Sequence, residues 1–225
     1  GYNVNAFRCG NFFVMVYYRE FFQASYVSSA AANGHLDIIR ATFRYLIPGL
    51  GDIGKCTRTA IQGDHLDVFK FIITKTENSN TCLELAIEHG AKNIVKWLIE
   101  HPKLDKIDNN IKTAYNTACK IGDIESIDLT ICDNKFIINN KWCGMCTAAK
   151  AGHYDAVDHL LNLGLDSYEC SLGKAIDAGH VRIVERVFPL AYPDMSIDRI
   201  NKLFTRACAM QHREIQQYFA NIGAI

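Results

Sequence analysis

Apolar residues recur along this chain at the three- and four-residue spacing of amphipathic helices. Each apolar run follows a shorter segment that contains an alanine and ends near a glycine. The pattern therefore predicts consecutive pairs of short helices, with the apolar run on the second helix of each pair. The clearest runs are Ile38, Ile39 and Leu46; Val68, Phe69 and Ile72; Ile94, Val95 and Leu98; Val157, Leu160 and Leu161; and Ile183, Val184 and Val187.

A short phrase recurs in register with these runs: an alanine, three further residues, a glycine and often a histidine. A phrase repeated at this interval indicates an array of similar structural units. The spacings between seven clear alanine anchors lie between 26 and 32 residues. The anchors are Ala30, Ala60, Ala86, Ala118, Ala148, Ala175 and Ala207, and a weaker copy has Ala6 with Gly10.

Each residue of the phrase has a predicted structural role. The small alanine lets the first helix pack closely, and the glycine suits a left-handed residue at that helix's end. Acidic residues two positions after the histidine suit the positive end of the second helix. Pro48, Pro102 and Pro189 are expected to stop second helices. The histidines, which we expect to bond backbone groups at the turn, are His35, His65, His153, His180 and His212.

The phrases Cys82–Gly90 and Cys146–Leu161 look like ankyrin repeats, and the resemblance extends from about Ala6 to the end of the chain. It implies an all-α fold, an α-solenoid of stacked helix-turn-helix repeats. Every spacing is shorter than the usual ankyrin period of 33 residues, so we expect reduced β-hairpin fingers. Thr81 and Thr113 keep the threonine of the family's Thr-Pro, but no copy has the proline.

The resemblance implies a single array over residues 1–225, with seven clear repeats and a degenerate one near Ala6. The chain opens with Gly1 rather than methionine, so we expect a fragment of a longer protein. Short, proline-poor repeats of irregular length are similar to those of large DNA viruses such as the mimivirus-like giants. Related forms occur in protists and intracellular bacteria. A viral source is therefore one expectation.

Composition narrows the classes of partner and compartment. The chain has 24 basic and 24 acidic side chains and no net charge, which disfavours nucleic acid as a partner. Nine scattered cysteines, an odd number, favour a reducing intracellular compartment, either the cytoplasm, that of a host, or a virion. The most apolar run, Phe12–Phe22, is too short to span a membrane and contains Arg19 and Glu20.

The run Phe12–Phe22 has two interpretations. It can be the second helix of the degenerate first repeat, covered by neighbouring repeats on both faces. Alternatively, it can be an exposed surface through which the chain assembles with a partner.

Two chemical motifs were weighed against the repeat. The string Trp142–Cys146 differs by one residue from the thiol-redox motif of thioredoxin-like enzymes, and Cys143 and Cys146 with His153 and Cys170 offer zinc ligands. However, Cys143 occupies the threonine position of its repeat, and the histidine recurs in copies that lack the cysteine pair. We therefore expect reduced cysteines, no metal, no cofactor and no catalytic site.

The predicted function is that of a non-enzymatic scaffold that docks a protein partner on its concave face. The resemblance implies that binding residues lie two and three positions after each anchor. Alternatives are a structural component of a viral particle or assembly, and a thiol-redox enzyme acting through Cys143 and Cys146. The candidate partner-binding residues are Asn33, Gln62, Glu88, His89, Lys120, Lys150, Asp177 and Met210.

Overall fold

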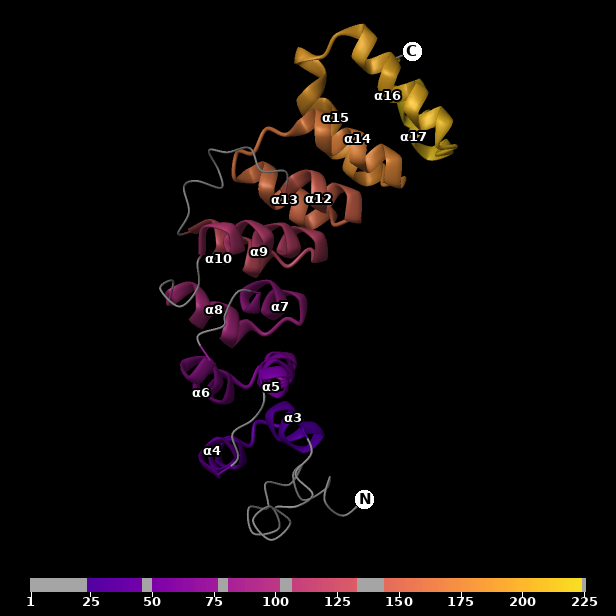
Figure 1. Cartoon of the computed structure of the whole chain (residues 1–225). Coiled ribbons are helices and arrows are strands. Elements are labelled where there is room, and N and C mark those ends of the chain that lie inside the picture. Colours follow the sequence, from indigo (N-terminus) through magenta and orange to yellow (C-terminus); the bar gives the residue numbers. More distant parts are fainter. Residues whose placement is uncertain (1–23, 46–49, 77–80, 102–106, 133–143, 224–225) are drawn as a thin grey trace. The chain divides into compact units, whose positions relative to one another are not determined.

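The computed structural model describes residues 24–45, 50–76, 81–101, 107–132 and 144–223 (Figure 1). Within these ranges the chain forms helices and contains no strand, so the predicted all-α class is confirmed there. The contacts divide the chain into two compact units, residues 1–111 and 112–225.

In the described part of the first unit, from residue 24 to residue 101, six helices form three pairs (Figure 1). The first helices of successive pairs pack on one another, α3 on α5 and α5 on α7. The second helices form a parallel row of contacts, α4 with α6 and α6 with α8. The bounds are α3 (Ala24–Ala32), α4 (Leu36–Tyr45), α5 (Leu50–Gln62), α6 (Leu66–Thr76), α7 (Cys82–Glu88) and α8 (Lys92–Glu100).

The second unit repeats this arrangement. Helix α12 packs on α14 and α14 on α16, while the second helices make the contacts α10 with α13, α13 with α15 and α15 with α17. Helix α9 begins before the division at residue 111 and contributes its later turns here. The bounds are α9 (Ile107–Ile121), α10 (Ile124–Cys132), α12 (Gly144–Ala151), α13 (Tyr154–Asn162), α14 (Tyr168–Ala178), α15 (Val181–Ala191), the 3-10 turn η3 (Tyr192–Asp194), α16 (Ile197–Ala209) and α17 (Arg213–Asn221).

The alanine anchors lie at the centre of the packing, because all seven are fully buried at 0 % exposure. In every copy the anchor carbonyl accepts a hydrogen bond from the backbone N–H five residues later, over 2.8–3.2 Å. This bond is the long hydrogen bond of a Schellman helix end. The repeated phrase therefore specifies the end of each first helix, as its composition predicted.

The residue four positions after each anchor is left-handed in all seven copies, with φ between 51° and 85°. Five copies have the predicted glycine; Asp64 (φ 51°) and Gln211 (φ 60°) adopt the same conformation with a side chain. The left-handed conformation costs a residue with a Cβ roughly 1–2 kcal/mol of conformational free energy. The turn keeps this conformation at both residues despite the cost. The structure of the repeat thus determines the turn geometry, with or without a glycine at this position.

Pro189 does not stop its helix, so that prediction is wrong. Helix α15 continues to Ala191 and contains Pro189 in its last turn. The flanking residues Val187, Phe188 and Ala191 are buried, and the Phe188 ring lies edge-on to Phe219, with centroids 5.2 Å apart. A proline near a helix end removes one backbone hydrogen bond. Burial of this apolar face compensates for that loss.

Two connections between repeats are fully described. Residues 163–167 form a turn and an irregular segment, and residues 192–196 contain the 3-10 turn η3. Neither contains a strand, in line with the reduced fingers expected from the short spacings. Pro48, Pro102 and the aromatic run Phe12–Phe22 lie outside the described residues.

Candidate protein-docking face

The recurrent histidine links each repeat to the one before it. Four imidazoles place Nε2 within hydrogen-bonding distance of the carbonyl oxygen two positions after the preceding anchor. The sequence predicted a backbone partner at the turn, and the partner found lies 30–35 residues upstream. The four bonds are His65 to Ala32 (2.9 Å), His153 to Lys120 (2.8 Å), His180 to Lys150 (3.2 Å) and His212 to Asp177 (3.2 Å).

The turn glycine also provides room for the histidine ring of the following repeat. A Cβ on Gly122 would lie 2.7 Å from His153, and one on Gly152 would lie 2.6 Å from His180. Such distances are too short for unbonded carbon atoms. Gly90 has open space at this point instead. At Gly122 and Gly152 the glycine therefore has two effects: it adopts the positive φ without steric cost, and it leaves room for the histidine ring.

The third repeat has Ala91 in place of the histidine and is joined to its predecessor differently. The carboxylate of Asp64 accepts hydrogen bonds from the backbone N–H groups of Asn93 (3.2 Å) and Ile94 (3.1 Å). These groups lie in the first turn of α8, whose N–H groups have no partner within the helix. Asp64 thus caps a helix of the next repeat, and this link explains why an aspartate replaces the glycine here.

The predicted binding positions are open to solvent. Counting from each anchor, positions +2 and +3 are exposed in every repeat, except that Asp177 is half-buried. They lie at the ends of the first helices, and their chemistry varies from repeat to repeat. The predicted residues seen exposed are Asn33, Gln62, Glu88, His89, Lys120, Lys150 and Met210.

At the last junction, position +2 of one repeat contacts position −1 of the next, an interaction that the sequence did not predict. Arg206, at −1, holds the carboxylate of Asp177, at +2, with two hydrogen bonds, one of 2.6 Å. The hydrogen bond from Arg206 holds the pKa of Asp177 below its ordinary value. Asp177 therefore connects two repeats through Arg206. It is a weaker candidate for partner contact than the other predicted residues.

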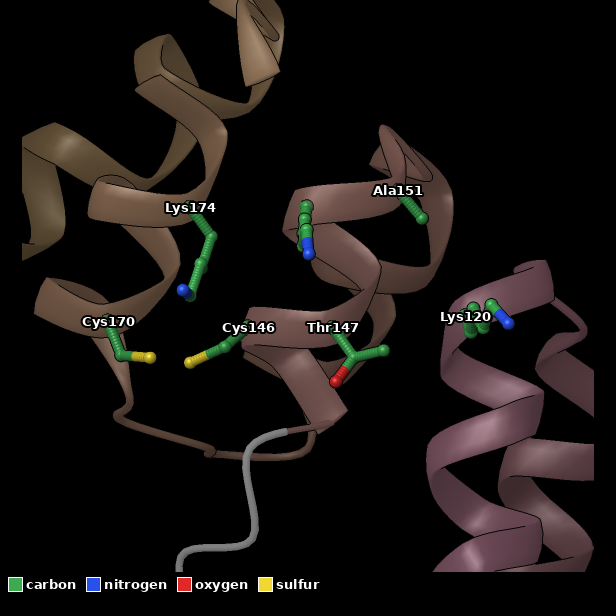
Figure 2. Close-up of a pocket in the computed structure, with 7 residues that line it drawn as sticks. Lys120, Cys146, Thr147, Ala151, Cys170 and Lys174 are labelled. Carbon is green, nitrogen blue, oxygen red and sulfur yellow. The ribbon is translucent and has the colours of Figure 1, made fainter. Parts of the chain in front are cut away.

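The same register forms a pocket at the two preceding junctions, all within the second unit. Its volume is about 510 Å³, and Lys120, Lys150 and Lys174 contribute three ammonium-bearing side chains. Figure 2 shows Cys146 on α12 pointing toward Cys170 on α14, while Thr147 on α12 lies on the side of Lys120, which comes from α9. We call this site the lysine pocket; it is lined by Lys120, Cys146, Thr147, Lys150, Ala151, Cys170 and Lys174.

Lys174 was missed because only positions +2 and +3 were considered. It stands at −1, where Arg206 stands in the next repeat, so two basic residues at that register were the available signal. The structure brings predicted Lys120 and Lys150 together with it, whereas the other predicted residues do not line this pocket.

The cysteines depart from the predicted fully reduced state at one position. Cys146 is disulfide-bonded, so the expectation of fully reduced cysteines is wrong at this position. Cys143 lies outside the described residues. The zinc candidate His153 instead bonds the Lys120 carbonyl, and the described residues contain no group of three His, Cys, Asp or Glu side chains that could hold a metal ion.

Side chains on the surface of the second helices connect each repeat to the next. Position +10 of one repeat contacts position +11 of the next, through ion pairs in the second unit and through cation–π contacts in the first. This use distinguishes the second-helix surface from the variable first-helix positions. The pairs are Asp128 with His159 (2.6 Å), Asp158 with Arg186 (2.6 Å), Arg40 with the Phe71 ring (5.9 Å) and Lys70 with the Trp97 ring (5.6 Å).

Comparison with known proteins adds no relative from which a function could be transferred. No protein-family model matches the chain, and no curated protein matches it. In the part of the chain that the structure describes, no helix has the length and apolar character to cross a membrane.

Proposed function

We propose that this chain is an ankyrin-type solenoid that acts as a non-enzymatic scaffold and docks a protein partner on its first-helix face. We define the first-helix face, within each unit separately, as positions +2 and +3 of its repeats, together with the lysine pocket in the second unit. One observation carries the proposal: these positions recur at one register, are exposed, and differ in chemistry from repeat to repeat. Variable side chains on a constant frame are what a solenoid presents to a partner.

The other positions of the repeat support the docking proposal because they are used for packing and for contacts between repeats. The anchors are buried, the turn carbonyls accept histidine hydrogen bonds, and the second helices carry the pairs between +10 and +11. Mutations at those sites would act through stability. Mutations at exposed first-helix positions such as Ala151 and Met210 should leave the fold intact, so these positions can be used to test binding alone.

The test starts with affinity capture by the full chain, followed by a measured Kd for each captured protein. Two exposed first-helix residues, Ala151 and Met210, are then replaced together by arginine. The matched control replaces Asn162 and Gln217, exposed on the second helices α13 and α17, by arginine. The proposal requires that the first pair weakens a captured partner and that the control does not. A partner weakened only by the control would contradict it.

A further inference from the structure

We propose that the lysine pocket binds an extended acidic segment of the docked protein, with a carboxylate at about every third residue. This inference rests on the proposed function, since it names the chemistry of the partner at one part of the first-helix face. The observation behind it concerns one pair of positions at the junctions between repeats. A carboxylate occupies this pair at the last junction and is absent from it at the two junctions before.

This pair, which we call the slot, consists of position +2 of one repeat and position −1 of the next. At the last junction Asp177 supplies a carboxylate to it, and Arg206 binds that carboxylate with two hydrogen bonds. At the preceding junction the same positions hold Lys150 and Lys174, which both line the pocket. Two cations therefore stand where the next junction has a cation and an anion.

Lys120 and Thr147 fill the slot one junction earlier, again without an acid. The last junction thus shows that this register can hold a basic group against a carboxylate. A partner that supplied carboxylates to the lysine pocket would complete the pattern seen between Asp177 and Arg206.

The two acidic residues of α14 are already engaged. Glu169 pairs with Arg199, and Asp177 pairs with Arg206. The three pocket lysines, in contrast, form no ion pair within the described residues. The pocket thus carries an excess of positive charge on a chain with no net charge, which favours an anionic ligand.

The spacing of the lysines sets the form of the ligand. Lys120, Lys150 and Lys174 lie on the successive first helices α9, α12 and α14. Packed helices lie about 8–10 Å apart, and a segment in the extended polyproline II conformation advances about 3.1 Å per residue with three residues per turn, so that every third side chain lies on one face. Acidic side chains about three residues apart therefore match successive helices. The small side chains of Ala151 and Thr147 between the lysines leave room for the peptide backbone.

A single-stranded nucleic acid is the main rival ligand, because lysines also bind phosphates. Proteins that bind single strands combine basic grooves with aromatic side chains on which the bases stack. None of the residues lining the lysine pocket is aromatic. The pocket chemistry therefore favours carboxylates on a flexible peptide.

The test measures binding of a fluorescein-labelled peptide of about ten residues to the full chain by fluorescence anisotropy. The peptide contains glycine and alanine, with glutamate at every third position. One control peptide replaces each glutamate by glutamine, and another places the same number of glutamates consecutively. A single-stranded oligonucleotide of similar charge is titrated in parallel.

The pocket variant replaces Lys120, Lys150 and Lys174 by glutamine. Glutamine is preferred to glutamate because Lys120 and Lys150 lie in the last turns of α9 and α12, where an acid would oppose the helix dipole. The control variant replaces Lys75, Lys96 and Lys202 by glutamine, which removes the same charge from exposed sites outside the pocket.

We expect the spaced peptide to bind more tightly than both control peptides and to lose affinity as salt rises. The pocket variant should weaken binding about tenfold, as three exposed ion pairs each contribute a few-fold, and the control variant less than about twofold. Equal binding by the two variants, or tighter binding of the oligonucleotide, would overturn the inference. If only this inference fails, a captured partner would still be weakened by the Ala151 and Met210 replacements; if the proposed function fails, it would not.

Discussion

Replacing Gly122 by alanine should destabilise the second unit more than replacing Gly164, although both glycines are left-handed. Their φ angles are 76° and 83°, so the conformational cost of an alanine is similar at the two sites. They differ in their surroundings. A Cβ on Gly122 would lie 2.7 Å from the His153 ring, whereas nothing lies within 4 Å of one on Gly164.

The magnitude follows from these two contributions. An alanine at positive φ costs about 1 kcal/mol. At Gly122 the His153 ring must also move, which breaks the 2.8 Å hydrogen bond from its Nε2 to the Lys120 carbonyl, worth about 1 kcal/mol. We therefore expect a loss in the free energy of unfolding of about 2 kcal/mol for Gly122→Ala and about 1 kcal/mol for Gly164→Ala.

A double-mutant cycle isolates the contact between the glycine and the ring. His153→Ala alone should cost about 1 kcal/mol, and in that background Gly122→Ala should cost only the conformational 1 kcal/mol or so. The two substitutions are therefore non-additive by about 1 kcal/mol. Urea unfolding followed by circular dichroism measures all four proteins. Equal costs at Gly122 and Gly164, or full additivity in the cycle, would refute the proposed role of the ring.

Three further predictions concern single side chains. Ala175→Asp places a charge at a fully buried anchor and should cost more than about 3 kcal/mol, seen as a lower urea midpoint; a loss below about 1 kcal/mol would contradict the close packing of anchors. Because Arg206 lowers the folded-state pKa of Asp177, the stability that this pair adds is present above the ordinary aspartate pKa and is lost as the pH falls through the lowered pKa. The advantage of the wild-type chain over Asp177→Asn should therefore be constant from about pH 5 to 7, remain below about 1 kcal/mol, and vanish in acid; an advantage that grows in acid would refute the assignment. Burial raises the pKa of Cys119 to about 12, so iodoacetamide at pH 8 should label exposed Cys208 and spare Cys119 in the folded chain, as read by mass spectrometry; equal labelling would contradict the burial of Cys119.

The end of each first helix could be predicted from the sequence because its causes are local. The anchor, the glycine and the residue after it lie within six positions and close one hydrogen-bonded turn. Asp64 and Gln211 broke the glycine pattern without breaking the turn. The two helices that flank the turn impose the left-handed geometry on these residues. The turn preference of each single residue does not include this constraint.

Contacts between repeats could not be predicted, because they depend on how successive helix pairs stack. The histidine was expected to bond its own turn region, and its acceptor lies on the preceding repeat. Lys174 enters the candidate site through the contact between positions −1 and +2, a register that only the packed structure displays. Pro189 was expected to end its helix. The helix continues to Ala191 because Phe188 and its neighbours are buried.

The most direct test of the docking proposal is site-specific photocrosslinking to a captured partner. A photoreactive phenylalanine derivative is introduced at Gln62, Ala151 or Met210 on the first-helix face, and at Lys75, Asn162 or Gln217 on the second helices, all of them exposed. Crosslinks to the partner from the first set and none from the second are the predicted result. Crosslinks confined to the second set would contradict the proposal that this chain binds its partner through its first helices.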